Sequence, residues 1–252
     1  MQSMQEWLLL IAPDKTHFLI NRAVKKISTH FGQIDLSKIK NSKVKSSKGV
    51  VFSVTKPSFI DFFKKLSRGP AVILPKDAAA ILINTGLGPG CKVIEIGTGS
   101  GWLTAHIAHI IGEGGKVITY ECQPKFAAIA QSNFKILGLK NIEIKVENAF
   151  EANFKKYKDF ADLFVVDLPN PEKILKKAKI VLKKGGWFVA YLPQITQVIE
   201  LAKALKNNFK KDFILEKVSE VFEREWHIDL PVARPQHNAL SHTAFLLFAR
   251  KI

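Results

Sequence analysis

The first part of the chain shows short apolar runs separated by polar turns, a pattern typical of a small β unit. The runs cover residues 7–12, 17–20, 23–27, 32–34 and 50–54. Residues 41–49 are rich in Ser, Lys and Gly and predict a loop between two of these strands. A helix is expected over residues 58–66, directly after Lys56-Pro57. This region therefore predicts a small domain built mainly from strands.

From Pro75 onward, apolar strands alternate with helical patterns. Helices are predicted over residues 76–85, 103–111, 124–137, 172–182 and 194–207. Strands are predicted over residues 92–96, 116–121, 142–146, 163–167, 187–192, 214–222 and 243–249. This alternation predicts an α/β fold with a mostly parallel seven-stranded sheet and helices on both faces. The composition changes near Arg68-Gly69-Pro70, so we expect a small β domain over residues 1–66 and a larger domain over residues 67–252.

Composition and charge narrow the class of protein. Hydrophobic residues make up 47% of the chain and charged residues 24%, the balance of a folded globular protein. The formal net charge is +16, and the excess lysine is spread along the whole chain. This charge favours a polyanionic partner, and a lysine-rich solvated surface is the alternative explanation.

Other features bear on the cellular compartment. The longest apolar stretches, residues 7–12 and 244–249, are far shorter than the roughly 20 residues that a membrane-spanning helix needs. No signal peptide is visible. Cys91 and Cys122 lack the spacing of a metal site or a disulfide framework. We therefore expect a cytoplasmic protein with no membrane partner and no metal.

The sharpest local signal is the sequence VIEIGTGSG over residues 93–101, an apolar strand that leads into a glycine-rich turn and a helix. Glycines let the backbone turn tightly and let a ligand approach its N–H groups. Glu121 ends the next predicted strand, 24 residues after Gly97. That distance is near the roughly 20-residue spacing at which a carboxylate binds ribose hydroxyls. An incidental tight turn is the alternative, but the pair favours an adenosine-containing cofactor.

The EIGTGSG sequence of residues 95–101 resembles motif I of class I methyltransferases, whereas a dinucleotide site would show G-x-G-x-x-G. The resemblance implies a Rossmann-like methyltransferase domain that uses S-adenosyl-L-methionine. It implies that Glu95 lies near the methionine amino group and that Glu121 holds the ribose. The residues expected at the cofactor are Glu95, Gly97, Thr98, Gly99, Ser100, Gly101, Leu103, Thr104, Glu121, Asn148, Ala149 and Asp167.

Two further strand ends carry candidate polar residues. Asn148 follows the third strand of the larger domain, where class I methyltransferases usually carry Gly-Asp, so we expect it to hydrogen-bond the adenine of the cofactor. A purely local turn is its alternative role. Asp167 begins the sequence DLPNP after the fourth strand, at the end of the sheet where ligands bind in open α/β folds. Capping of the helix near Glu172 is its alternative role.

The DLPNP sequence of residues 167–171 resembles the D-L-P-x-P segment of the tRNA adenine-58 N1 methyltransferase family. Other segments resemble the same family, namely residues 67–77, 191–198, 233–237 and 242–246. Residues 238–241, Asn-Ala-Leu-Ser, replace the Arg-Met-Val-Gly of the family, which changes the expected RNA contact at this loop.

This resemblance implies that Asp167 faces the target adenine and acts in catalysis together with Tyr191. It implies substrate contacts from Tyr191, Arg234, His237 and His242, and structural roles are the alternative for Tyr191 and the two histidines. The expected partners are a tRNA substrate and three further copies of the chain in a homotetramer.

The predicted reaction is transfer of a methyl group from S-adenosyl-L-methionine to N1 of adenine 58 in the T-loop of tRNA, with adenine 57 as a second candidate position. N1 carries a ring lone pair, so alignment and charge stabilisation matter more than a strong general base. Two alternatives stay open. One is a protein L-isoaspartate O-methyltransferase, whose motif I is similar, and the other is a non-catalytic RNA-binding paralogue.

Overall fold

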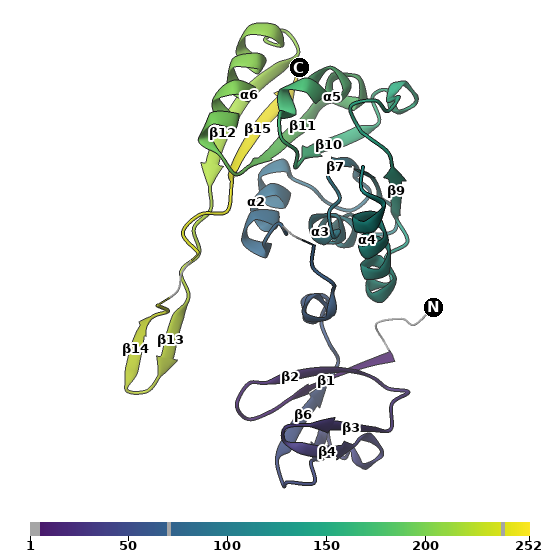
Figure 1. The fold of residues 1–252 in the computed structure, drawn as a ribbon, viewed down its shortest axis with the longest axis vertical. Coiled ribbons are helices and arrows are strands. Elements are labelled where there is room, and N and C mark those ends of the chain that lie inside the picture. The colour runs from purple at the N-terminus through teal and green to yellow at the C-terminus, as the bar shows by residue number, and fades with distance from the viewer. Residues whose placement is uncertain (1–5, 70–71, 238–239) are drawn as a thin grey trace. The chain divides into compact units, whose positions relative to one another are not determined.

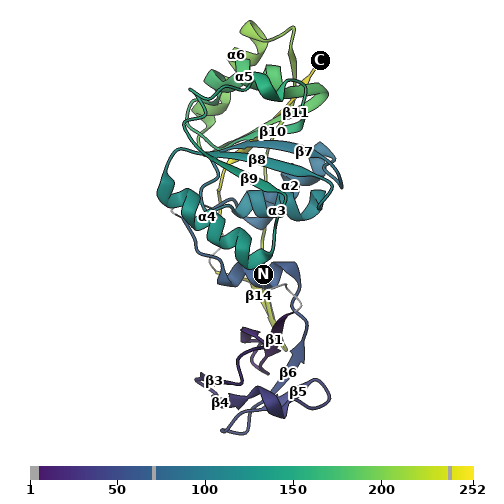
Figure 2. The ribbon, with the colours of Figure 1, turned by 90° about the vertical axis from the view of Figure 1, so that its right-hand side faces the viewer.

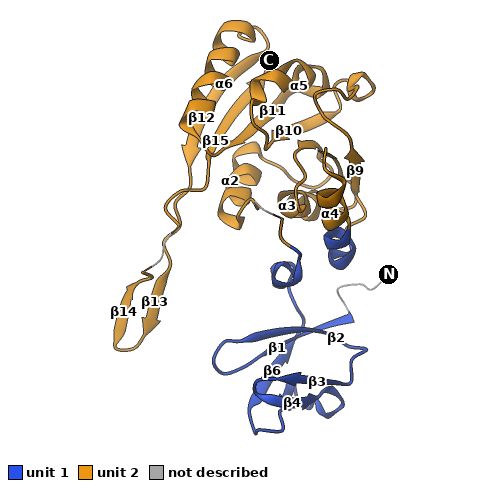
Figure 3. Ribbon diagram, in the orientation of Figure 1, with its two compact units in different colours: residues 1–67, 132–138 blue, residues 68–131, 139–252 orange. Residues whose placement is uncertain are grey.

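The structure, a computed structural model, describes residues 6–69, 72–237 and 240–252. It divides the chain into two compact units, which Figure 3 colours separately. Unit 1 comprises Met1–Ser67 and Ser132–Gly138, and unit 2 comprises Arg68–Gln131 and Leu139–Ile252. Two positions of the altered segment 238–241, Asn238 and Ala239, lie outside the described residues.

Unit 1 is built on an antiparallel sheet of order β2-β1-β6-β5 and a separate hairpin of β3 and β4. Its strands are β1 (Trp7–Ile11), β2 (His17–Asn21), β3 (Lys26–Thr29), β4 (Gly32–Asp35), β5 (Lys43–Lys45) and β6 (Val51–Thr55). Leu10, Ile34 and Phe52 are fully buried at the centre of its core. The short helix α1 (Phe59–Phe62) and the 3-10 turn η3 (Phe63–Lys65) follow the sheet. The predicted small β region is confirmed.

The expectation of a plain loop over residues 41–49 was wrong, because this segment contains β5. Val44 is buried between the exposed side chains of Lys43 and Lys45, and β5 pairs with β6 in antiparallel register. A single apolar residue between two lysines gives too short an alternation to be distinguished from a loop by pattern alone.

Unit 2 contains a seven-stranded sheet of order β12-β15-β11-β10-β7-β8-β9 (Figure 1). Its strands are β7 (Lys92–Ile96), β8 (Lys116–Glu121), β9 (Ile142–Val146), β10 (Ala161–Val166), β11 (Leu182–Leu192), β12 (Phe213–Glu220) and β15 (Phe245–Lys251). Only β15 is antiparallel, since it runs opposite to both β11 and β12. The predicted Rossmann-like, mostly parallel sheet is therefore confirmed.

Helices cover both faces of this sheet, as Figure 2 shows. They are α2 (Pro75–Thr85), α3 (Trp102–Ile111), α4 (Pro124–Leu137), α5 (Leu175–Val181) and α6 (Ile195–Asn208). Alternate residues of each central strand enter opposite cores, because side chains in a strand point to alternate faces. Val93 of β7 packs in the core beneath α2 and α3, whereas its neighbour Ile94 packs in the core beneath α5 and α6. Both side chains are fully buried, which fixes the register of β7.

A two-stranded hairpin lies between β12 and β15 along the chain. It consists of β13 (Trp226–Asp229) and β14 (Val232–Pro235), and we call residues 222–242, which contain it, the arm. Figure 1 shows the hairpin projecting from the sheet of unit 2. The sequence analysis placed no element here and extended the preceding strand to residue 222, whereas β12 ends at Glu220. The hairpin was missed because its apolar residues do not pack into the core of unit 2. Its sequence therefore lacks the apolar pattern that predicts a core strand.

Candidate active site

The glycine turn joins β7 to α3 and brings the end of β10 close to it. Gly97 has a φ of +93°, and a Cβ at this position would lie 2.4 Å from the carbonyl oxygen of Asp167. Only glycine therefore allows the turn and the end of β10 to approach so closely. At Gly99 the φ is +54°, and a Cβ would meet nothing within 4 Å. Open space at this position leaves the backbone accessible to a ligand.

Glu121 stands at the end of β8, beside the glycine turn. Its carboxylate accepts hydrogen bonds from the backbone N–H groups of Gly99 and Gln123, each at 2.9 Å. Because a carboxylate offers about four lone-pair sites, two backbone bonds leave acceptor capacity for hydroxyl groups of a ligand. Glu121 therefore shapes the turn and keeps its ability to hold a ribose.

Glu95, Glu121 and Asp167 gather negative charge at the ends of three neighbouring strands. Glu95 is only 2% exposed, and Thr104 of α3 donates a hydrogen bond to it at 2.5 Å. Burial raises the pKa of Glu95 to about 7. Burial, followed by the charge of Glu121, raises the pKa of Asp167 to about 6. These carboxylates repel one another, so the site suits a ligand that carries positive charge.

Thr98, Ser100 and Leu103, which the sequence analysis also placed at the cofactor, are buried around the same turn. The hydroxyls of Thr98 and Thr119 lie 2.6 Å apart, which joins the turn to β8. The backbone N–H of Gly101 donates to the carbonyl of Thr98 at 2.8 Å and closes the turn before α3 begins. The structure thus brings the predicted residues of segments 95–104 and 121 together.

Asn148 follows β9 and makes local contacts in this structure. Its Oδ1 accepts from the backbone N–H of Phe150, and its Nδ2 donates to Glu151, both at 3.0 Å. Its side chain is exposed, and each of these two amide atoms keeps a further acceptor or donor position for a ligand.

A lysine that the sequence analysis did not single out holds the same loop. The Nζ of Lys177 donates to the backbone carbonyls of Ala149, Phe150 and Ala152, at 2.8, 2.7 and 2.7 Å. Burial lowers the pKa of Lys177. Nothing in the local sequence marks this lysine, because its three partners are more than twenty residues away along the chain.

Tyr191, near the end of β11, faces several polar groups. Burial, together with the charge of Asp77, raises the pKa of the Tyr191 phenol to about 12, and the Thr243 hydroxyl and the charge of Asp167 also act on it. The structure thus brings Tyr191 and Asp167 together at the same end of the sheet. Asp77 and Thr243 are additions that the sequence analysis did not assign to the site.

The three remaining predicted residues lie on the arm. Arg234 is exposed on β14 opposite His227, and His237 is exposed just beyond that strand. In the part of the chain that the structure describes, no hydrogen bond or ion pair joins either of them to the glycine turn or to Asp167. His242 stands where the arm returns to the sheet, with its Nδ1 2.5 Å from Glu220 and its Nε2 2.9 Å from the carbonyl oxygen of Pro193.

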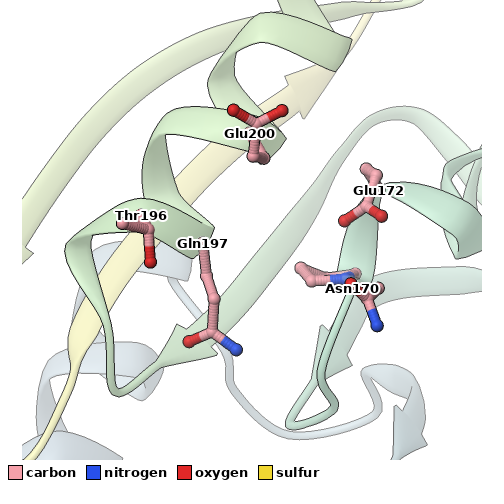
Figure 4. A pocket seen from close by; sticks show the side chains of 6 residues that line it. Asn170, Glu172, Thr196, Gln197 and Glu200 are labelled. Carbon is pink, nitrogen blue, oxygen red and sulfur yellow. The ribbon is translucent and has the colours of Figure 1, made fainter.

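A cavity of about 380 Å³ opens between the loop after β10 and the start of α6. Figure 4 shows the side chains that line it on both sides, namely Asn170, Glu172, Thr196, Gln197 and Glu200, and Pro171 completes the lining. The loop that forms one wall begins at Asp167, so this cavity adjoins the candidate site along the chain. Its amide and carboxylate groups can exchange hydrogen bonds with a polar ligand.

Within residues 6–69, 72–237 and 240–252, no group of His, Cys, Asp and Glu side chains is arranged to hold a metal ion. Within the same ranges no helix combines the length and the apolar character required to cross a membrane.

The fold and the site together define a class I, S-adenosylmethionine-dependent methyltransferase. The sheet order, the glycine turn after β7 and the acidic residue after β8 carry this assignment. The chain belongs to the tRNA methyltransferase complex GCD14 subunit family, whose model matches residues 64–231.

The chain is similar to named tRNA methyltransferases and also to a methyltransferase that acts on another class of substrate. The tRNA (adenine(57)-N(1)/adenine(58)-N(1))-methyltransferase TrmI of Methanocaldococcus jannaschii is 33% identical, over 96% of this chain and 94% of its own length. The tRNA (adenine(58)-N(1))-methyltransferase TrmI of Thermus thermophilus is 38% identical, over 82% of this chain and 80% of its own. A protein-L-isoaspartate O-methyltransferase of Methanococcus aeolicus is 32% identical, over 68% of this chain and 78% of its own.

Solved structures share the complete fold. The crystal structure of the tRNA (m1A58) methyltransferase TrmI from Aquifex aeolicus superposes with a TM-score of 0.81 at 26% identity, covering 100% of this chain and 98% of that one. The SAM-dependent O-methyltransferase from Thermotoga maritima superposes with a TM-score of 0.85 at 31% identity, covering 100% of this chain and 94% of that one.

Proposed function

We propose that this protein transfers a methyl group from S-adenosyl-L-methionine to N1 of adenine 58 in the T-loop of tRNA, with adenine 57 as a second position. The observation that carries the proposal is the close approach of the end of β10 to the glycine turn, where the backbone carbonyl oxygen of Asp167 would lie 2.4 Å from a Cβ of Gly97. Because the Asp167 side chain begins at this point, its carboxylate is proposed to face the target base beside the bound donor. The similarity to TrmI proteins over most of the chain supports the choice of substrate.

The site fits the proposed donor. The open backbone at Gly99 gives room for it, Glu121 retains acceptor capacity for ribose hydroxyls, and the acidic cluster suits its cationic centre. When bound, S-adenosyl-L-methionine supplies an electrophilic methyl group on a positively charged sulfur. Glu95 is proposed to lie toward its amino group and Asn148, with Ala149, toward its adenine.

Asp167 is proposed to act on the acceptor adenine. Methylation at N1 places positive charge on the base, and an ionised carboxylate held nearby stabilises that charge. The same carboxylate can accept a hydrogen bond from the exocyclic amine and so favour adenine. With a pKa of about 6, Asp167 is mostly ionised at neutral pH. Tyr191 is proposed to hold the base after it has left its stack, because a base in a duplex or a loop must be displaced to enter a pocket.

Lysine and arginine side chains are proposed to bind the phosphates of the tRNA backbone. The net charge of +16 gives binding that weakens as salt is added, because phosphate contacts release counterions. Arg234 and His237, both exposed on the arm, are proposed to contact the tRNA. His242, where the arm returns to the sheet, is proposed as a third contact. Because tRNA is the proposed substrate, a cytoplasmic location is proposed as well.

We propose a homotetramer in which the arm contacts another copy of the chain. Its apolar side chains are strongly exposed, with Trp226 at 57% and Leu230 at 86%. Clustered exposed apolar side chains on a soluble protein usually mark an interface. A second copy provides the same kind of apolar surface and can cover it.

The deciding experiment is transfer of a radiolabelled methyl group to unmodified tRNA transcripts, followed by nucleoside analysis of the product. The expected product is N1-methyladenosine in the T-loop, and a transcript with adenine 58 replaced tests the position. Methylation of an isoaspartyl peptide and not of tRNA would support the isoaspartyl alternative. Donor binding without transfer to either substrate would support the non-catalytic RNA-binding paralogue.

A further inference from the structure

The Lys76 ammonium uses all three of its N–H donors inside the protein. Its side chain, in the first turn of α2, is only 7% exposed. Nζ donates to Asp77 Oδ1 at 2.8 Å, to the carbonyl oxygen of Val221 at 2.7 Å and to Thr243 Oγ1 at 2.6 Å. A lysine has three donors and no acceptor, so this set satisfies it completely. The three bonds therefore fix the position of the Lys76 ammonium.

Two of these partners mark the roots of the arm. Val221 directly follows β12, where the chain leaves the sheet, and Thr243 lies two residues before β15, where the chain returns. One buried cation thus joins both roots to α2. These partners are 145 and 167 residues away from Lys76 along the chain, so the contact exists only in the folded protein.

The third partner connects the roots to the proposed base site. Asp77 is fully buried, and its Oδ2 has no hydrogen-bond partner among the described residues. Tyr191 packs in the same core as Ala78 of α2, and it pairs with Leu246 of β15, three residues beyond Thr243. The charge of Asp77 raises the pKa of the Tyr191 phenol and the Thr243 hydroxyl lowers it, in keeping with this placement. Tyr191 therefore lies beside the Lys76 network, at the end of the sheet that carries Asp167.

We propose that Lys76 is a positioning residue for methyl transfer, joining the roots of the arm to Asp77 and Tyr191 so that the placement of Tyr191 depends on how the arm is held. This inference rests on the proposed function, since it assumes that Tyr191 meets the target base. A buried ion pair alone is a poor source of stability, because desolvation offsets much of the attraction. Because Lys76 also bonds to two distant segments, the pair fixes the positions of these segments relative to α2.

The test compares four variants of the full-length protein in the tRNA methylation assay. Lys76→Met removes the ammonium, Lys76→Arg keeps the charge, and Thr243→Val removes one acceptor while leaving the Lys76 and Asp77 pair intact. Lys183→Met is the matched control, because Lys183 forms a 2.6 Å ion pair with Asp162 at the opposite end of the sheet.

We expect Lys76→Met to lower kcat about 10- to 100-fold, because small misplacements at a reacting site have effects of this size. Donor affinity, measured by calorimetry, stays within about twofold of wild type, since Lys76 contacts none of the proposed donor residues. We expect Lys76→Arg to retain part of the wild-type kcat. The kcat of Thr243→Val should lie between those of the wild type and Lys76→Met. If Lys76 acts through Tyr191, the double variant Lys76→Met with Tyr191→Phe is no slower than the slower single variant.

Equal kcat values for Lys76→Met and Lys183→Met would overturn the inference, as would independent, multiplying losses in the double variant. Should Lys76→Met fail to fold, the kcat of Lys76→Arg compared with that of Lys183→Met decides in the same way. A wild-type protein that does not methylate tRNA at all contradicts the proposed function instead. In that case the resonance of isotope-labelled Tyr191 decides, since it must shift in Lys76→Met or Lys76→Arg and stay unchanged in Lys183→Met.

Discussion

The glycine turn and the arm belong to the same unit, but their surroundings differ. Around the turn, Thr98 and Thr104 are buried, and their hydroxyls bond to Thr119 and Glu95 of the same chain. On the arm, Trp226 and Leu230 expose most of their side chains to solvent. The turn is thus held by contacts within one chain. The exposed apolar side chains of the arm are instead typical of a surface that another molecule covers.

Replacing Asp167, which lies beside the glycine turn, should cause the largest loss of activity. Assembly through the arm should stay the same. For Asp167→Ala we expect kcat to fall about 100- to 1000-fold, the usual consequence of removing one group that stabilises transition-state charge. Donor affinity, measured by calorimetry, should fall far less than kcat, and the oligomeric state, measured by light scattering, should stay the same. Asp167→Asn is the matched variant, because it keeps the shape and removes the charge. Full turnover in either variant would refute the proposed role.

Changes on the arm should have the converse effect. We expect Trp226→Ser with Leu230→Ser to weaken assembly by about 2 kcal/mol or more, the size typical of lost aromatic anchors at interfaces. Donor binding should remain. Light scattering over a range of concentrations measures the assembly, and Ile83→Ser is the control, because Ile83 is a strongly exposed apolar residue outside the arm. An unchanged oligomer, or equal dissociation of the control, would contradict the assignment of the arm.

The glycine turn offers a sharper comparison between two glycines. Gly97→Ala combines a φ of +93° with a clash against Asp167, whereas Gly90→Ala has a φ of +85° and meets nothing within 4 Å. Both should lose about 1–3 kcal/mol of unfolding free energy from backbone strain. Only Gly97→Ala should also lose donor affinity, because only there must the end of β10 move away. Equal donor affinities in the two variants would show that the close approach has no role in binding.

The last comparison concerns pH. Because burial raises the pKa of Glu95 to about 7, the folded protein holds this proton more tightly than the unfolded chain. The free energy of unfolding should therefore decrease as the pH rises from about 4.5 to about 7, by about 3 kcal/mol at most. Affinity for the cationic donor should rise over the same range, because the carboxylate becomes ionised.

Glu95→Gln should flatten both pH profiles, and Glu113→Gln, a change at an exposed glutamate, should leave them unchanged. Chemical denaturation and calorimetry at several pH values provide the two readouts. A profile that persists in Glu95→Gln would assign the titration to another group.

Sequence patterns predicted the central sheet well because its signals are local. β7, β8, β9 and α4 begin and end where the sequence indicated, since each apolar run is bounded by Gly, Pro or charged residues. The predicted helix over residues 172–182 is instead a 3-10 turn, η5 (Pro171–Ile174), followed by α5. Asn170 before it adopts a left-handed conformation, and the chain becomes helical only gradually.

The parts of the site that were missed have no local signal. Lys76 and Asp77 are adjacent charged residues at a helix start, a pattern that usually indicates a solvated helix end, yet their side chains are buried by segments far away in the chain. Asn148 remains the residue predicted at the cofactor adenine, and the bonds of its side chain to Phe150 and Glu151 could not be predicted from its position after a strand. Sequence spacing predicts which residues lie at the end of the sheet. It does not predict which hydrogen-bond partners their side chains have in the folded protein.

The antiparallel pairing of β12 with β15 makes the arm the connection of a hairpin whose two strands are already neighbours. The length of such a connection affects folding only through loop-closure entropy, which changes by about 0.6 kcal/mol for each doubling of the loop. Lys76 and His242 hold the two ends of that connection together. The arm is therefore an interchangeable module, and exchange for the arm of a relative, or for a short turn, should leave the register of the sheet intact.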